Sequence, residues 1–195
     1  IMASLAFGIP LQFDKAYVEG ITQLTRDDVS YAEELGYRIK HLGIARRTAD
    51  GIELRVHPTL IPADRLIANV HGVKNAVLVQ SDPVGATLYY GAGAGAGPTA
   101  SAVVADIVDL VRSLTAESSP NVPHLAFMPQ AIAATPILAM ESVVTSYYLR
   151  LQAEDKPGVL ADVTRILSSR GISIEAIVQK PAQAEGAVPV IILTN

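Results

Sequence analysis

The stretch that most constrains the fold is YYGAGAGAGPTASAVVADI, which runs from Tyr89 to Ile107. Its glycines alternate with alanines up to Pro98, and a strand-like run, GATLYYG, comes directly before them. The residues after the proline have the pattern of a helix. The chain must therefore pass from a strand into a helix through a short segment in which no side chain is larger than a methyl group.

The alternating glycines have three interpretations. From Gly91 the spacing is G-x-G-x-x-A, which is compatible with a dinucleotide-binding turn between a strand and a helix. A complete Rossmann unit also needs a second parallel strand that ends in Asp or Glu roughly 20 residues later. The segment LTAESSPNVPHLAF contains no such strand, so an independent Rossmann motif is excluded. A flexible linker is disfavoured because a strand and a helix adjoin the glycines tightly.

Two interpretations of the glycines remain open: close approach of a ligand to bare backbone, or a corner that only packs. Pro98 is typical of a first helical position, which makes Gly97 the N-cap and puts Thr99 in the first turn. The helix then presents free N–H groups and a partial positive charge beyond the glycines. The residues alone do not decide between a ligand site and a corner.

Local signals predict the elements that precede this segment. One helix is expected to end at Gly8, and another to begin at Thr25, which forms a capping box with Asp28, and to end at Gly36. Two strand-like runs flank TADG, which is a hairpin signal. The second run is expected to close at His57–Pro58, because proline favours a strand end or an edge.

Composition excludes several classes of function. The net charge of −4 provides no basic field for nucleic acid or for an anionic membrane surface. No apolar run approaches the roughly 20 residues that span a bilayer. The absence of cysteine fits a reducing compartment such as the cytoplasm and removes thiolate chemistry. The four histidines show no metal-ligand spacing, so we expect no metal site.

The C-terminal part of the sequence changes character. Residues 116–146 hold several prolines and little periodicity, and they are expected to be a linker. From Tyr147 the pattern is strand, helix, strand, strand. The helix has an apolar stripe and Gly171 as its C-cap; the stripe consists of Val159, Leu160, Val163, Ile166 and Leu167. A sheet with a single helix leaves one face uncovered, so a partner or a missing element is expected there.

These residues resemble homoserine dehydrogenase. The family's glycine-rich segment YYGxGAGxxPTASAVVxD is matched by Tyr89–Asp106 almost residue for residue. The stretch VEGITQLTRDDVSYAEELGYRIKHLGIA is similar to its helix-to-strand element. The run YYLRLQAEDKPGVLADVTRILSSRGISIEAIVQK is similar to its C-terminal ACT domain, a small amino-acid-sensing module. The glycine segment followed by EDKPGVL is specific in this order.

The resemblance implies an α+β fold: a mixed β-sheet with helices on one face, followed by a ferredoxin-like βαββ ACT domain that is incomplete at its C-terminus. It divides the chain into 1–115, a substrate and dimerisation domain truncated at its N-terminus, the linker 116–146, and the ACT domain 147–195. The nucleotide-binding domain and the proton-transferring lysine of the family are expected upstream of Ile1. We therefore expect no catalytic residue within this chain, and no activity from it alone.

The resemblance also implies the reaction, which reduces aspartate 4-semialdehyde to homoserine with NADPH or NADH in threonine and methionine biosynthesis. The choice between NADP and NAD stays open, because the family sets it in the nucleotide-binding domain. Carried over residue by residue, Gly95 is the first candidate for backbone contact with the cofactor, and Gly93 is the second. A homodimer or homotetramer is implied, without nucleic acid or membrane as a partner.

The ACT-like residues imply an effector, with threonine expected because the family's pathway leads to it. Gly158 opens the helix, so its N–H groups face outward and are able to hold a carboxylate. Asp155 is the candidate for the α-amino group, and Gln179 offers both a donor and an acceptor. The alternatives stay open that Asp155 only caps the helix and that Gln179 is only an exposed strand residue.

The competing function belongs to another class. A non-enzymatic sensor would use its ACT domain to bind an amino acid and control a partner. The glycine segment favours the enzyme, because a sensor needs no such turn.

Overall fold

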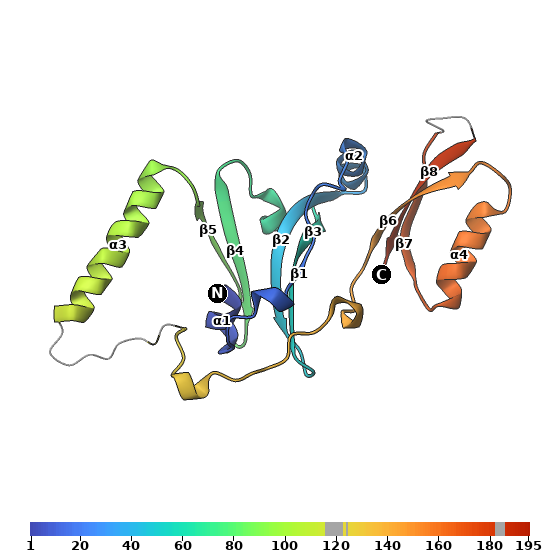
Figure 1. Ribbon diagram of the computed structural model, residues 1–195. Helices are drawn as coiled ribbons and strands as arrows, with labels where there is room; N and C mark the ends of the chain where they lie inside the picture. The colour runs from blue at the N-terminus through green and yellow to red at the C-terminus, as the bar shows by residue number, and fades with distance from the viewer. Residues whose placement is uncertain (116–122, 124, 182–185) are drawn as a thin grey trace. The chain divides into compact units, whose positions relative to one another are not determined.

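The computed structural model describes residues 1–115, 123, 125–181 and 186–195. Residues 116–122 and 124, in the predicted linker, and 182–185, between the last two strands, lie outside the described residues. By contacts the chain forms two compact units, Ile1–Ala139 and Met140–Asn195. The domain boundaries expected at 115 and 146 stay a prediction. The predicted α+β class is confirmed, since both units combine sheets with helices (Figure 1).

The first unit contains a mixed sheet and a separate two-stranded sheet. In the mixed sheet the strand order is β1-β3-β2, with β1 parallel and β2 antiparallel to β3. The second sheet is the antiparallel pair β4–β5. The elements are α1 (Met2–Phe7), η1 (Phe13–Lys15), β1 (Tyr17–Val18), α2 (Arg26–Glu34), β2 (Tyr37–Arg47), β3 (Ile52–Pro62), η2 (Leu66–Asn69), β4 (Lys74–Ser81), β5 (Gly85–Ala92), α3 (Ala96–Thr115) and η3 (Pro129–Ala131).

Helix ends in this unit follow the local signals. Helix α1 ends at Gly8, which has a left-handed φ of 63°. Helix α2 begins with the predicted capping box: Thr25 Oγ1 accepts from the Asp28 N–H, and the Asp28 carboxylate accepts from the Thr25 N–H at 2.8 Å. Because Asp28 is buried, its carboxylate satisfies the Thr25 N–H, which water does not reach. The glycine end of α1 and the capping box of α2 are confirmed, whereas α2 ends at Glu34 with Leu35 as its C-cap, one residue before the expected Gly36.

Strand β3 does not end at His57–Pro58 as the sequence predicts; it continues to Pro62. Proline has no backbone N–H, and the strand continues because the missing N–H of Pro58 would point to a side of β3 where no strand needs it. The carbonyl of Val56 accepts from the Glu19 N–H at 2.8 Å, so Val56 faces the side of β3 where β1 lies. Pro58, two residues further, faces that same side. Strand β1 has already ended there, so no ladder bond is lost.

The segment 133–138, which we call the strap, is held to the first unit by backbone hydrogen bonds. The Ala133 N–H donates to the Gly8 carbonyl, and the Leu138 N–H donates to the Ile52 carbonyl, each at 2.9 Å. The Ile52 N–H in turn donates to the Pro136 carbonyl at 2.9 Å. The strap is therefore part of the first unit, although it lies within the segment expected to be a linker.

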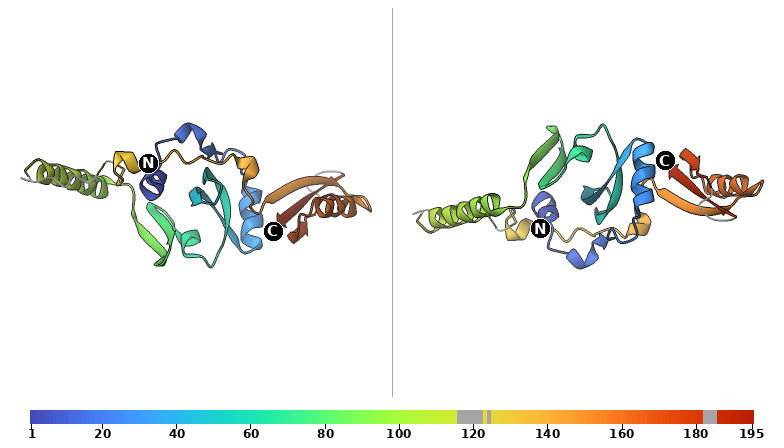
Figure 2. Two further views of the ribbon diagram at one scale, coloured as in Figure 1. Left: turned by 90° about the horizontal axis from the view of Figure 1, so that it is seen from below. Right: turned by 90° about the horizontal axis from the view of Figure 1, so that it is seen from above.

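The second unit has the predicted βαββ order, with three antiparallel-paired strands in the order β6-β8-β7. Helix α4 packs on one face of this sheet (Figure 2), where Ala153, Val188, Val190 and Ile192 form the buried core. Helix α4 ends at Ser169 with Arg170 as its C-cap, so the expected C-cap Gly171 lies one residue further, with a left-handed φ of 70°. The elements are η4 (Met140–Ser142), β6 (Tyr148–Glu154), α4 (Val159–Ser169), β7 (Ile174–Gln179) and β8 (Ala187–Thr194).

One expectation for this unit is wrong, and another stays a prediction. Ile166 is 62% exposed, because it lies at the margin of the α4 stripe, whereas the other four stripe residues pack on the core. That a partner or a missing element covers the second face of the sheet stays a prediction. On that face of the central strand, Pro189 and Ile191 alternate with the core residues of β8, and both are fully buried.

The close contact between Gly51 and the strap gives a first prediction. Gly51 has a φ of 155°, and a Cβ there would lie 2.6 Å from the Pro136 carbonyl oxygen. Gly51→Ala should lower the free energy of unfolding by about 2–4 kcal/mol, since backbone strain and the clash act together. Chemical denaturation of the full-length protein measures this change.

The matched control is Gly36→Ala, which has a φ of 81° and open space around its Cβ position. It carries the conformational cost alone, about 1–2 kcal/mol. Equal losses in the two variants would contradict the proposed role of the strap contact.

Candidate functional site

The glycine segment lies at the end of the β4–β5 hairpin, where β5 leads into α3 (Figure 1). Strand β5 ends at Ala92, opposite Lys74 of β4, and the Gly93 N–H still donates to the Val73 carbonyl at 3.3 Å. The chain then turns through residues 93–95. We call residues 93–95 the glycine turn. Every residue of α3 is exposed, so the helix extends away from the strands.

Helix α3 begins at Ala96, which corrects the expectation that Gly97 is its N-cap. The first intrahelical hydrogen bond runs from the Thr99 N–H to the Gly95 carbonyl at 3.1 Å, so Gly95 is the N-cap. Pro98 is therefore the third helical residue. It fits there because the first N–H groups of a helix have no partner within the helix. Sequence reasoning missed this start because it relied on the usual place of proline.

The two candidate glycines of the turn are required for different reasons. Gly95 has a φ of 117°, which L residues rarely adopt, while the nearest atom to a Cβ there would be Pro98 Cδ at 3.6 Å. Gly93 has no positive φ, but a Cβ there would overlap the side-chain amide nitrogen of Asn75. Gly91 and Gly97 face open space and show neither requirement. Packing thus explains the glycine at position 93. At Gly95, only Pro98 lies near the place of a side chain, so this side of the turn is accessible.

The side chains around the glycine turn are polar and aromatic. Lys74 Nζ lies 5.8 Å from the ring centroid of Tyr90, which is a cation–π distance. Tyr89 and Tyr90 are both more than half exposed. A positive charge and bare backbone therefore occur together at this end of the hairpin, an arrangement able to receive an anionic ligand.

Two of the three candidate effector residues, Asp155 and Gly158, lie at one end of the second unit's sheet, and Gln179 lies further along it. Asp155 follows the last residue of β6, and its N–H donates to the Gly186 carbonyl at 3.3 Å. Gln179 is the last residue of β7. Strands β6 and β7 flank β8 and run in the same direction, but they do not end level: Glu154 pairs with Ala187 and Gln179 pairs with Val190, so β7 stops three residues, roughly 10 Å, short of the end of β6. Gly158, with a φ of 95°, is the N-cap of α4, which starts at this end.

The simpler interpretation of Asp155 is wrong. The N-cap of α4 is Gly158, and no side chain forms a capping hydrogen bond there, so Asp155 does not cap the helix. Within the part of the chain that the structure describes, its carboxylate has no hydrogen bond or ion pair. Gln179 is an exposed residue of an edge strand, as the simpler interpretation held, and it pairs with Val190.

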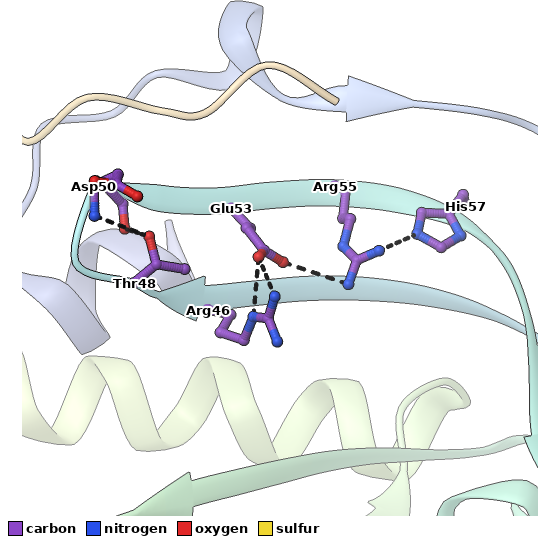
Figure 3. A network of polar contacts seen from close by, with 7 residues as sticks. Arg46, Thr48, Asp50, Glu53, Arg55 and His57 are labelled. Atoms are coloured by element: carbon purple, nitrogen blue, oxygen red, sulfur yellow. Dashed lines mark hydrogen bonds and ion pairs between the residues drawn. The ribbon is translucent and has the colours of Figure 1, made fainter. Parts of the chain in front are cut away.

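A buried ionic network on β2 and β3 is a feature that sequence reasoning missed (Figure 3). Glu53, only 2% exposed, accepts from Arg46 Nε at 3.0 Å and pairs with Arg55 Nη2 at 3.4 Å. Arg55 Nη1 lies 3.4 Å from His57 Nε2. The signal was present as the alternation Glu-x-Arg-x-His, which places the three side chains on one face of a strand.

A shallow groove of about 490 Å³ lies between the β2–β3 turn, the end of α1 and the strap. Arg47 forms part of it, donating from Nη2 to the Phe7 carbonyl at 2.8 Å and lying over the Phe7 ring. No predicted site residue lies in this groove. Its lining includes Phe7, Gly8, Arg47, Asp50, Phe127 and Pro136.

The described ranges hold neither a metal-ligand cluster nor a membrane-spanning helix. In residues 1–115, 123, 125–181 and 186–195, no three His, Cys, Asp or Glu side chains converge as they would around a metal ion. Across the same residues, no helix combines the length and the apolar character needed to cross a bilayer.

Comparison with known proteins agrees with this geometry. Residues 147–195 match the family model of the ACT domain, so the chain is of the class that joins an α+β domain to an ACT domain. Residues 1–108, which include the whole glycine turn, match the family model described as homoserine dehydrogenase. The chain belongs to the homoserine dehydrogenase family.

Individual relatives support the assignment over the whole chain. The homoserine dehydrogenases of Pseudomonas aeruginosa and Neisseria gonorrhoeae are 65% and 56% identical to it, covering 100% of the chain and 45% of each relative. The crystal structure of a homoserine dehydrogenase from Thiobacillus denitrificans, 65% identical, superposes with a TM-score of 0.90 over 100% of this chain and 44% of that one. The chain thus spans a little under half the length of these relatives.

The ionic network gives a second prediction. Glu53→Gln should lower the free energy of unfolding by about 3–5 kcal/mol, because it leaves the guanidinium of Arg55 buried without its counter-ion. Thermal and chemical unfolding of the full-length protein report the loss.

The control is Arg46→Gln, which removes the other partner of Glu53. The Arg46 side chain is 56% exposed, so its loss should cost no more than about 1 kcal/mol. A Glu53→Gln variant as stable as Arg46→Gln would show that the network contributes nothing to the fold.

Proposed function

We propose that the full-length protein is an oxidoreductase that interconverts L-homoserine and L-aspartate 4-semialdehyde with NAD or NADP, in threonine and methionine biosynthesis. The match of residues 1–108 to the homoserine dehydrogenase model carries this proposal. The glycine turn supports it, because it offers exposed, bare backbone beside a basic side chain. We also propose that the protein acts in the cytoplasm as a homodimer or homotetramer.

Within this activity the glycine turn is proposed to line the nucleotide side of the cleft. The nicotinamide ring of the bound cofactor supplies the hydride acceptor or donor. The backbone of Gly95 is the first candidate for contact with the cofactor, since a Cβ at this position would meet only Pro98 and open space. Gly93 is the second candidate. The residues that transfer the proton are expected from the part of the protein outside this chain.

The ACT domain is proposed to bind threonine as an effector of the enzyme. A free α-amino acid presents an ammonium and a carboxylate on one carbon. Asp155 offers the ammonium a carboxylate that has no partner among the described residues, and the Gly158 N-cap lies at the same end of the sheet for the carboxylate. Gln179, on the far side of β8, offers an amide to the side-chain hydroxyl.

The proposed contact at Gly95 gives a third prediction. In the full-length protein, homoserine oxidation with either nicotinamide cofactor should be measurable, and Gly95→Ala should raise the Michaelis constant for the cofactor about tenfold or more. A Cβ there both strains the backbone and occupies ligand space. Steady-state assays at saturating homoserine measure the effect.

Gly36→Ala is again the control, because it has a positive φ and lies outside the glycine turn. It should lower the melting temperature without changing the Michaelis constant. A similar melting shift in both variants with an unchanged Michaelis constant in Gly95→Ala would leave only the packing role. Absence of turnover in the wild type would refute the enzyme itself.

The proposed effector site gives a fourth prediction. Calorimetric titration of the full-length protein with threonine should release or absorb heat, and Asp155→Asn should weaken the affinity about tenfold or more, since a charge-assisted hydrogen bond is lost. Asp162→Asn is the matched control, because the Asp162 carboxylate is already paired with Arg165 on the exposed side of α4. No heat with threonine, methionine or isoleucine would mean that the ACT domain serves assembly only.

A further inference from the structure

A side chain that no sequence motif singled out lies against the glycine turn. Asn75 lies on β4 directly opposite Gly91, and its amide lies against the backbone of Gly93. A Cβ on Gly93 would overlap the Asn75 amide nitrogen and lie only 2.7 Å from its Cγ. No other atoms are close enough to require glycine at this position, and its φ is not positive. Gly93 is therefore glycine because the Asn75 amide occupies the place of its side chain.

The Asn75 amide is also free to bind something else. The residue is exposed, and within the described residues its side chain forms no hydrogen bond. An amide carries two donors and one acceptor oxygen. From Ala92 to Ala96 the turn has no side chain larger than a methyl group. A ligand that approaches this backbone therefore meets the Asn75 amide as the polar side chain directly beside it.

We propose that Asn75 contacts the cofactor, and that Gly93 is glycine to give the Asn75 amide its position. This inference rests on the proposed function, because it takes the ligand of the turn to be a nicotinamide dinucleotide. It differs from the simpler view that Gly93 itself makes the contact through its backbone. Such a dinucleotide offers phosphate, hydroxyl and carboxamide groups, each of which hydrogen-bonds to a side-chain amide.

The two views differ in how substitutions combine. An alanine at 93 displaces the end of the Asn75 side chain and not a backbone segment, so the fold tolerates it. If the amide makes the contact, Gly93→Ala and Asn75→Ala remove the same interaction, and the double variant loses nothing more. If the Gly93 backbone makes the contact, Asn75→Ala has little effect, and the two losses add.

The experiment is a double-mutant cycle in the full-length protein. The dissociation constants of NADH and NADPH are measured by the fluorescence of the reduced nicotinamide, together with kcat, the Michaelis constants and the melting temperature. We expect each single variant to bind the preferred cofactor roughly 3- to 10-fold more weakly, the equivalent of one net hydrogen bond, and the double variant to match them. The melting temperatures should change little, because Asn75 is exposed.

Two further variants test whether the donors of the Asn75 amide make the contact. Asn75→Asp keeps the size of the side chain but replaces its donors with a negative charge, so it should weaken binding at least as much as Asn75→Ala. Gln80→Ala removes another exposed amide from the same strand, far from the turn, and should leave both dissociation constants unchanged.

Wild-type affinity in Asn75→Ala, or additive losses in the double variant, would overturn the inference while leaving the proposed function intact. A loss in Asn75→Ala that follows the melting temperature alone would assign Asn75 to the fold and overturn it as well. A wild-type protein that binds neither NADH nor NADPH would refute the proposed function, and the inference with it.

Discussion

The first unit depends on the antiparallel ladder between β2 and β3, which pairs eleven residues of each strand. Strand β3 is the common support: β1 lies on its other side, and the strap bonds to its first residue, Ile52, which is completely buried. The register follows from the tight turn after Arg47, where the Thr48 N–H donates to the Gly51 carbonyl at 2.8 Å. A shift of one residue would reverse the face of every side chain on β3.

The same ladder explains why buried charge is tolerated beside the core. Glu53, Arg55 and His57 alternate with Ile52, Leu54 and Val56, so one face of β3 is polar and the other apolar. Burying a single carboxylate costs several kcal/mol, and two guanidinium groups offset that cost here. The network therefore also favours the observed register of β2 on β3, because a shift of one residue would separate Glu53 from Arg46, which lies directly opposite it.

The glycine turn works by a different constraint, the absence of side chains. Gly95 is needed for its positive φ, whereas Gly93 leaves room for the amide of Asn75. The two glycines of the turn are therefore required for different reasons. Exposed tyrosines and Lys74 complete the surroundings of the turn. In the second unit, β6 and β7 run in the same direction on either side of β8, and the register places Gln179 three residues short of the end of β6 that precedes Asp155.

The sequence by itself determined the features that depend on neighbours within about four residues: the Thr25–Asp28 cap, the turn after Arg47 and the left-handed glycine at the end of α1. Its motifs also identified the family. Only the tertiary structure decided contacts between distant residues. The strap on Ile52, the free side of Pro58 and the amide of Asn75 against Gly93 all follow from strand register and packing. Register and packing depend on the whole sheet, and no local pattern of residues encodes which distant residue will lie opposite a given one.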